Sequence, residues 1–427
     1  MPVSSTFMFV SQLDPHRREA LELLLATMTS EPGLADPNNS ELPFARLPGL
    51  HFARIVILDD NTAADNASYG VSTNPAAPKI AFLGDIDGKR EDFVKDLVGI
   101  AGPGLSRIFA HCLDFNPAVP LDAWLTAHNI EPVVNYSNWP GRTVRQVHDE
   151  AALRAALISY LPQERPLAAS PLDLHRRLRD RVMNEGPKPP APQSISLEER
   201  LRDALDLVTN IVLLVLLSPL LLIVAPFFLL ILRRRETTDA SVLARPSDEH
   251  LKSLVVREDF EVTNQFSAYG TVKPGRFRLW TLIFVFWVLG VTTRHLYTRG
   301  RLARVGSIHF ARWVFLDDHK HLFFGSNYDG SLEAYMDDFV NKAAFGLNLV
   351  FSNGIGYPRT RYLILDGAKD EQAFKYYIRR HQLPTAIWYK AYPGLTTADI
   401  ARNARVRQGL DTTRMSDALA RQWLAEL

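Results

Sequence analysis

Hydrophobic and polar positions along the first part of the chain follow the two periods of regular secondary structure. Residues 6–13 alternate as a strand does, and residues 15–28 carry apolar side chains at helical spacing with proline at the entry. The same reading predicts strands over 51–58 and 79–83, a helix from about residue 89 and a strand around 108–113. A helix over 120–128, a strand over 132–136 and a terminal helix extend this βαββαβ order.

The pattern recurs in the second part because the sequence is internally duplicated. Residues 51–60 read HFARIVILDD and residues 309–318 read HFARWVFLDD, which is eight identities in ten positions. The register continues through the Asp-Gly pairs at 87–88 and 329–330. A match sustained over about 100 residues indicates two related halves.

The duplication predicts the fold class. The order βαββαβ is that of the ferredoxin-like unit. We therefore expect an α+β protein with two ferredoxin-like repeats that form a pseudo-dimeric α+β barrel, with an inserted apolar membrane segment. The expected parts are a first repeat (1–161), a Pro-rich linker (162–195), a membrane-anchoring helical segment (196–235) and a second repeat (236–427) with an interfacial helix at 276–299.

The stretch from Val208 to Leu232 is almost wholly apolar. As a straight helix it extends about 37 Å, enough to span a bilayer core of about 30 Å once. A single crossing would separate two halves that are expected to pack together. A re-entrant hairpin broken at Pro219 and Pro226 would keep both halves on one side of the membrane. The sequence leaves spanning and re-entry open.

Charge and cysteine content narrow the partners and the location. The chain has 48 Lys and Arg against 47 Asp and Glu, so the basic excess typical of nucleic-acid binding is missing. The single cysteine, Cys112, excludes an intrachain disulfide and a multi-cysteine metal site. Arginines on both sides of the apolar stretch favour the cytoplasmic face. We expect a membrane protein that contacts the lipid bilayer, with its soluble domains on the cytoplasmic side.

A histidine and an arginine recur at the same positions of the two HFAR strands. They are His51 and Arg54 in the first half and His309 and Arg312 in the second. Alternation places the histidine and the arginine of each strand on opposite faces. In a shared cleft, the arginines would bind substrate and the histidines would act as bases or metal ligands. The structural alternative is a histidine hydrogen-bonded to backbone and an arginine paired with an acidic strand end. Whether a metal is bound is unknown.

Further candidates follow the strands. Asp87 and Asp329 are candidate catalytic residues, although turn and helix N-cap chemistry also explains an Asp-Gly pair between a strand and a helix. Tyr328, Trp388 and Tyr389 lie at strand ends, where aromatic side chains can line a ligand pocket. We treat these three as candidate substrate-binding residues, with core packing as the alternative.

The segment GDIDG at 84–88 resembles the G-x-x-D-G motif of dye-decolourising peroxidases, haem enzymes that also contain two ferredoxin-like units. By that resemblance Asp87 would be the distal acid and base for peroxide cleavage, and haem is a possible cofactor. No cofactor is otherwise indicated.

A second resemblance covers much of the second half. The segments SIHFARW, SNYDGS and WYKAYPGLT resemble a bacterial family of membrane-associated proteins of unassigned activity. Two functions follow from the sequence. One is a membrane-anchored, haem peroxidase-like oxidoreductase acting on a lipophilic substrate. The other is a non-catalytic lipid-binding or scaffold membrane protein. Whether the protein is an enzyme stays open, and a small lipophilic ligand is a candidate partner beside the lipid bilayer.

Overall fold

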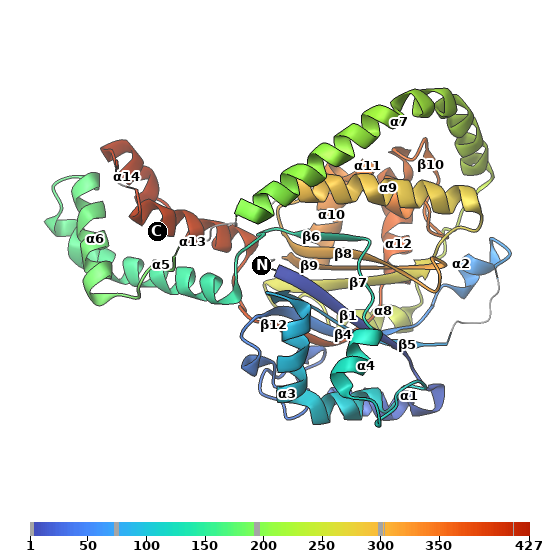
Figure 1. Ribbon diagram of the computed structural model, residues 1–427, viewed down its shortest axis with the longest axis horizontal. Helices are drawn as coiled ribbons and strands as arrows, with labels where there is room; N and C mark the ends of the chain where they lie inside the picture. The colour runs from blue at the N-terminus through green and yellow to red at the C-terminus, as the bar shows by residue number, and fades with distance from the viewer. Residues whose placement is uncertain (1–3, 72–76, 192–196, 298–301, 303, 413) are drawn as a thin grey trace.

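Two mainly antiparallel sheets form the centre of the molecule, and helices cover their outer faces (Figure 1). The computed structural model describes residues 4–71, 77–191, 197–297, 302, 304–412 and 414–427. The first sheet has the order β1 (Ser4–Gln12), β5 (Lys79–Asp87), β4 (Leu50–Leu58), β12 (Thr385–Lys390), β3 (Leu34–Ala35) and β2 (Thr29–Glu31). The second has the order β6 (Val134–Ser137), β8 (Ile308–Leu316), β9 (His321–Asp329) and β7 (Thr263–Thr271). The mixed α+β class is confirmed.

The last strand of each half belongs to the sheet of the other half. Strand β12, from the second half, pairs antiparallel with β4, and β6, from the first half, pairs antiparallel with β8. Backbone hydrogen bonds therefore join the two halves in both directions. Sheet membership does not follow the expected repeat boundaries at 161 and 236.

Isolated backbone bridges also link the sheets at their edges. Phe9 of β1 pairs with Asn129, shortly before β6, and Ala268 of β7 pairs with Gln382, shortly before β12. The ferredoxin-like repeats and the closure of a barrel stay predictions at this point, because the long described strands form two separate ladders.

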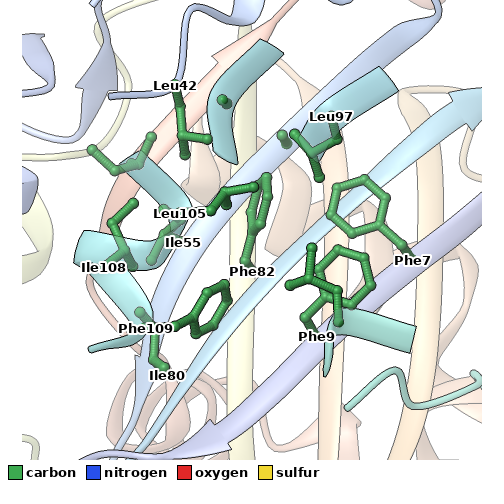
Figure 2. Packing of buried hydrophobic residues seen from close by; sticks show 14 of the residues in the cluster. Phe7, Phe9, Leu42, Ile55, Ile80, Phe82, Leu97, Leu105, Ile108 and Phe109 are labelled. Atoms are coloured by element: carbon green, nitrogen blue, oxygen red, sulfur yellow. The ribbon is translucent and has the colours of Figure 1, made fainter. Parts of the chain in front are cut away.

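The outer face of the first sheet is covered by α1 (Arg18–Ala26), α3 (Arg90–Phe109) and α4 (Leu121–Ala127). Figure 2 shows part of this core, in which Leu105, Ile108 and Phe109 of α3 pack with sheet residues such as Phe82. The strand expected around 108–113 is therefore wrong. Ile108 and Phe109 continue the helical spacing of the buried residues of α3 and end that helix instead.

The second half carries a matching outer layer. It consists of α9 (Arg276–His295), α10 (Leu332–Lys342), α11 (Ala344–Phe351) and α12 (Glu371–His381). The helix expected at 276–299 is present as far as His295, and residues 298–299 lie outside the described residues. Shorter elements are α2 (Ala63–Ala67), α8 (Asp248–Val255), and the hairpin of β10 (Thr360–Arg361) and β11 (Leu365–Asp366).

A lobe of four helices extends from one side of the sheets (Figure 1). It contains α5 (Val144–Glu164), α6 (Pro171–Glu185), α13 (Thr397–Leu410) and α14 (Asp417–Leu424). The linker expected at 162–195 is therefore helical over much of its length. Ser170 caps α6, and the apolar residues of α6 at helical spacing, such as Leu174 and Leu178, are buried in the lobe. Residues 192–195 lie outside the described residues.

The apolar segment is one continuous helix, α7 (Leu197–Thr238), of 42 residues. The re-entrant hairpin was expected to interrupt the helix at Pro219 and Pro226. This expectation is wrong, because both prolines lie inside the helix. Figure 1 shows α7 bending as it passes over α9, and proline is a common cause of such a bend. By length and composition alone, α7 and α9 are each long and apolar enough to cross a membrane.

Candidate functional site

The arginines of the HFAR repeat cross from one sheet to the other. Arg54 on β4 donates from Nη1 to the carbonyl oxygen of Phe266 at 2.6 Å, and from Nη2 to that of Ser326 at 2.8 Å. Arg312 on β8 donates to the carbonyl oxygens of Phe7 at 2.9 Å and Gly84 at 3.0 Å. The two arginines therefore hold the inner faces of the sheets together in a pseudo-twofold arrangement.

One carboxylate contacts one guanidinium group directly and the other through an asparagine. Arg312 pairs with the carboxylate of Asp85, whereas Arg54 donates to the side-chain oxygen of Asn327 at the equivalent position of the other half. Asn327 in turn donates from Nδ2 to Asp85 Oδ2 at 3.3 Å. All four side chains are buried. We call Arg54, Arg312, Asp85 and Asn327 the axis cluster. The sequence pattern indicated its arginines but not the other two residues.

The axis cluster carries a net positive charge inside the protein. Burial, together with the neighbouring Arg312 guanidinium, lowers the pKa of Arg54 to about 9, although the Asp85 carboxylate opposes this shift. Arg54 stays protonated at neutral pH, since its pKa is still well above 7. Without Asp85, two positive charges would face each other in the interior with no counter-charge in contact.

The free space at the axis cluster is small. A cavity of about 10 Å³, roughly the space that one water molecule needs, lies between Arg54, Arg312 and Trp388. Phe52 and Phe310 lie on its walls with ring centroids 5.7 Å apart, and Trp388 stacks on Phe52 at 5.4 Å. Pockets for small molecules usually measure about 300 Å³ or more. A haem or a lipophilic substrate does not fit between these residues.

Each histidine of the repeat is linked through an aspartate to the start of a helix. In the first half, His51 Nε2 lies 3.0 Å from Asp87 Oδ1, and Asp87 Oδ2 accepts the backbone N–H of Val144 at 3.0 Å. Val144 is the first residue of α5. A carboxylate at a helix N-terminus satisfies a free N–H group and interacts favourably with the helix dipole.

The second half repeats this arrangement. His309 Nε2 lies 2.7 Å from Asp329 Oδ1, and Asp329 Oδ2 accepts hydrogen bonds from the backbone N–H of Thr397 at 2.7 Å and from its hydroxyl at 2.8 Å. Thr397 is the first residue of α13. The two aspartates thus hold helices of the side lobe, rather than capping the helices that follow them directly in sequence.

The histidines lie on the inner side of the sheets. The expected alternation fails there because the register shifts between Leu50 and Phe52, as it does between Ile308 and Phe310. The ring of His51 lies 5.5 Å from that of Phe310, and its Nδ1 is 3.0 Å from the hydroxyl of Tyr392. The bulge therefore places each histidine beside the phenylalanines of the HFAR strands.

The three aromatic candidates are divided between the inner and outer faces. Trp388 lines the axis cavity, as expected for a residue near a site. Tyr328 stacks on Tyr335 with centroids 4.0 Å apart, and Tyr389 stacks on Phe44 at 4.8 Å. Both tyrosines belong to the outer hydrophobic cores and do not line this cavity.

The Asp329 carboxylate gives a pH-dependent prediction. Burial raises its pKa, but the charge and hydrogen bond of His309 and the hydrogen bonds of Thr397 outweigh burial and lower the pKa below its usual value. A carboxyl whose pKa is lower in the folded state stabilises the fold above the unfolded pKa of about 4, and loses this effect as the pH falls through the folded pKa. We expect Asp329→Asn to lower the free energy of unfolding by about 1–3 kcal/mol at pH 7, and the gap from wild type to narrow at pH 3. Urea unfolding in a non-ionic detergent measures this gap. An equal gap at both pH values would contradict the account.

A cluster of acidic residues on the surface does not form a free metal site. Glu333, Asp337 and Glu371 are close enough together to share an ion. The ammonium group of Lys375 already lies between them, with its Nζ 2.5–2.9 Å from one oxygen of each. The lysine neutralises part of their charge and occupies the position that a cation would need.

Comparisons of the chain with protein-family models, curated proteins and solved structures find no match. The likeness to dye-decolourising peroxidases and to a bacterial membrane-associated family therefore stays an expectation from motifs. The functional conclusion depends on the geometry of the chain itself.

Proposed function

We propose that this protein is a membrane-attached lipid-binding or scaffold protein, the second of the two functions that the sequence suggests. Helix α7 would enter one leaflet of the bilayer from the cytoplasmic side. The two halves would form a pseudo-dimeric α+β barrel of two ferredoxin-like repeats, which serves as the rigid frame. The exchange of β6 and β12 and the edge bridges at Phe9 and Ala268 support this barrel, because they connect the two sheets at both ends.

The exposed apolar surface of α7 carries the proposal. None of the residues in the most apolar 18-residue stretch of this helix is buried, and leucines such as Leu216 and Leu222 are more than 70% exposed. Soluble proteins rarely expose contiguous apolar patches of this kind, which mark protein or membrane contacts. A bilayer would remove this surface from water.

Both ends of α7 are fastened to the same side of the second half. Near its C-terminal end, the buried Glu236 carboxylate accepts the backbone N–H groups of Tyr362 and Leu363, each at 2.9 Å. Near its N-terminal end, Asn210 Oδ1 accepts the indole N–H of Trp287 on α9 at 3.0 Å. The middle of the helix is left without such contacts.

The lengths of the two helices explain why α7 bows outward. The contacts with α9 that lie nearest the middle of α7 are Asn210 to Trp287 on one side and Phe228 to Phe277 on the other. The intervening stretch is about 27 Å long in α7 but only about 15 Å long in α9, at 1.5 Å per residue. A helix of this length between such points must rise by about 11 Å at its middle. We call residues 211–227 the arch. Its height approaches half of a bilayer core of about 30 Å.

The arch accounts for attachment to one leaflet. A helix whose two ends bind one face of a folded domain cannot place those ends in opposite compartments. Arginines at the base of the arch, such as Arg202 and Arg234, are exposed and available to anionic headgroups. Basic residues on both flanks favour the cytoplasmic face.

The oxidoreductase alternative has less support. The paired His51 and His309 are engaged by carboxylates that hold helices, and the cavity at the axis cluster accepts no more than about one water molecule. These contacts favour a structural role for the repeated motifs. The proposal is tested by labelling a cysteine placed at each end of α7 with a membrane-impermeant thiol reagent. Both cysteines are expected to react from the same side of the membrane.

A further inference from the structure

The second half contains an apolar cavity that no part of the proposed attachment uses. It measures about 280 Å³ and lies between α9, α10, α11 and β8. Its inner wall consists of buried side chains, including Phe339, Leu347, Val350 and Trp313. The volume is nearly twice that of an engineered apolar cavity of about 150 Å³ that binds benzene.

The lining excludes most polar ligands. The hydroxyl of Thr292 already donates to the carbonyl oxygen of Leu289 at 2.9 Å. Apart from Thr292, the polar atoms of the lining side chains are those of Tyr297 and Trp313. Charged groups are not found among the described lining residues. Burying a charged group there without partners would cost far more than burying a hydrocarbon chain.

The internal duplication allows the cavity to be compared with the equivalent region of the first half. Residues Phe339, Leu347 and Val350 correspond to Leu97, Leu105 and Ile108 of the first half, at the same offset as Asp329 from Asp87. In the first half these residues belong to one hydrophobic core with the fully buried Leu42 (Figure 2). Apolar side chains of the chain itself thus fill the equivalent core.

A pair of equivalent glycines, Gly104 and Gly346, shows how the two halves differ in packing. A Cβ atom at Gly104 would lie 2.0 Å from the carbonyl oxygen of Glu41, so the segment next to Leu42 is packed directly against α3. A Cβ atom at the equivalent Gly346 would have no neighbour within 4 Å. No described segment of the second half covers Gly346, and the cavity occupies that place.

The mouth of the cavity lies on the proposed membrane side. Phe284 and Val288 of α9 line the cavity and are also exposed, together with Phe345 of α11. On α9, these two residues continue a stripe that starts with the exposed Trp280 and lies on the side where Trp287 contacts α7. A lipid chain beside the arch would therefore reach the cavity without crossing water.

We infer that this cavity binds one hydrocarbon chain of a membrane lipid, in the place that Leu42 and its neighbours fill in the first half. The inference rests on the proposed attachment to the membrane. The chain would enter between Phe284, Val288 and Phe345 and leave its headgroup at the membrane surface.

Gly346→Leu tests the inference because Gly346 lines the cavity and an added Cβ atom there enters open space, so the leucine side chain is expected to take up part of the cavity. The replacement also favours the helix, since leucine is a better helix former than glycine. We use cis-parinaric acid, a fluorescent long-chain fatty acid, titrated into the full chain in lipid nanodiscs with empty nanodiscs subtracted. Wild type should show saturable binding with energy transfer from tryptophan. Gly346→Leu should weaken this binding at least about ten-fold, a difference of about 1.4 kcal/mol.

The matched control is Gly99→Leu. Gly99 is also a helical glycine at which an added Cβ atom would have no neighbour within 4 Å, but it lies on α3, away from the cavity. It should leave binding unchanged. If Gly346→Leu lowers the melting temperature, Gly346→Met, with a more flexible side chain, replaces it. Wild type without saturable binding, or a filled cavity that still binds the probe as tightly, would overturn the inference. Flotation of Gly346→Leu with liposomes should stay as in wild type, so a failure here is distinguishable from failure of membrane attachment.

Discussion

Asp85→Asn is expected to cause the largest loss of stability among single substitutions in the sheet interface. The variant keeps the shape of the side chain but removes the carboxylate that pairs with the buried Arg312 and that is linked to the buried Arg54 through Asn327. Breaking a buried ion pair by removing one partner typically costs about 3–5 kcal/mol. Native proteins are stable by only about 5–15 kcal/mol. Urea unfolding in a non-ionic detergent should therefore show a strongly lowered midpoint.

The internal symmetry supplies a rescue variant. Asp85→Asn combined with Asn327→Asp moves the carboxylate to the equivalent position beside Arg54 and leaves the number of charges unchanged. We expect the double variant to recover more than half of the lost free energy. A double variant as unstable as Asp85→Asn alone would show that the two positions are not interchangeable, and would contradict the pseudo-twofold account of the axis cluster.

Lysines in the arch are expected to weaken membrane binding by about 100-fold or more. Leu216→Lys with Leu222→Lys places two charges where we propose that α7 meets the hydrocarbon core. A lysine near the centre of a membrane helix costs about 2.5–3.5 kcal/mol, and each 1.4 kcal/mol is a ten-fold change in binding. Snorkelling of the long side chains reduces the cost, so 100-fold is a conservative expectation. Flotation with liposomes that contain anionic lipid measures the bound fraction.

The control variant carries the same added charge outside the arch. Leu201→Lys with Leu243→Lys changes two exposed leucines, one before and one after the arch. This variant should float as wild type does. Because Leu216 and Leu222 are also exposed, the arch variant should keep the thermal stability of wild type. Equal flotation of the arch variant and the control would count against the arch as the membrane contact.

The sequence predicted the elements that its own patterns encode. The HFAR repeat gave the duplication, and alternation gave the long strands. The apolar run from Val208 to Leu232 predicted a long apolar helix, which is α7. The prediction of a strand at 108–113 was wrong because short apolar segments fit both helical and strand patterns. The bulges at His51 and His309 also escaped detection, since one extra residue in a ladder leaves no mark on composition.

Features that depend on contacts between distant segments were not predictable. Strands β6 and β12 each pair with a strand of the other half. The alternation of apolar and polar residues in a strand predicts which face is buried, but not which strand lies next to it. Asp85 was missed because the candidates were chosen as residues identical in both repeats, and the equivalent residue of the second half is Asn327. Gly104 and Gly346 are equivalent positions of the two repeats. The core is filled at Gly104 because the backbone of Glu41 packs on it, and this contact cannot be read from the sequence pattern.

Attachment to a single leaflet is tested most directly by the accessibility of the two ends of α7. Arg202→Cys and Arg234→Cys introduce exposed thiols on either side of the arch. Burial raises the pKa of the native Cys112 to about 12, so this thiol stays unreactive at neutral pH. We expect a membrane-impermeant maleimide to label both variants in sealed inside-out vesicles and neither variant in right-side-out vesicles. Labelling of the two positions from opposite sides would show that α7 spans the bilayer, and would contradict the one-leaflet account.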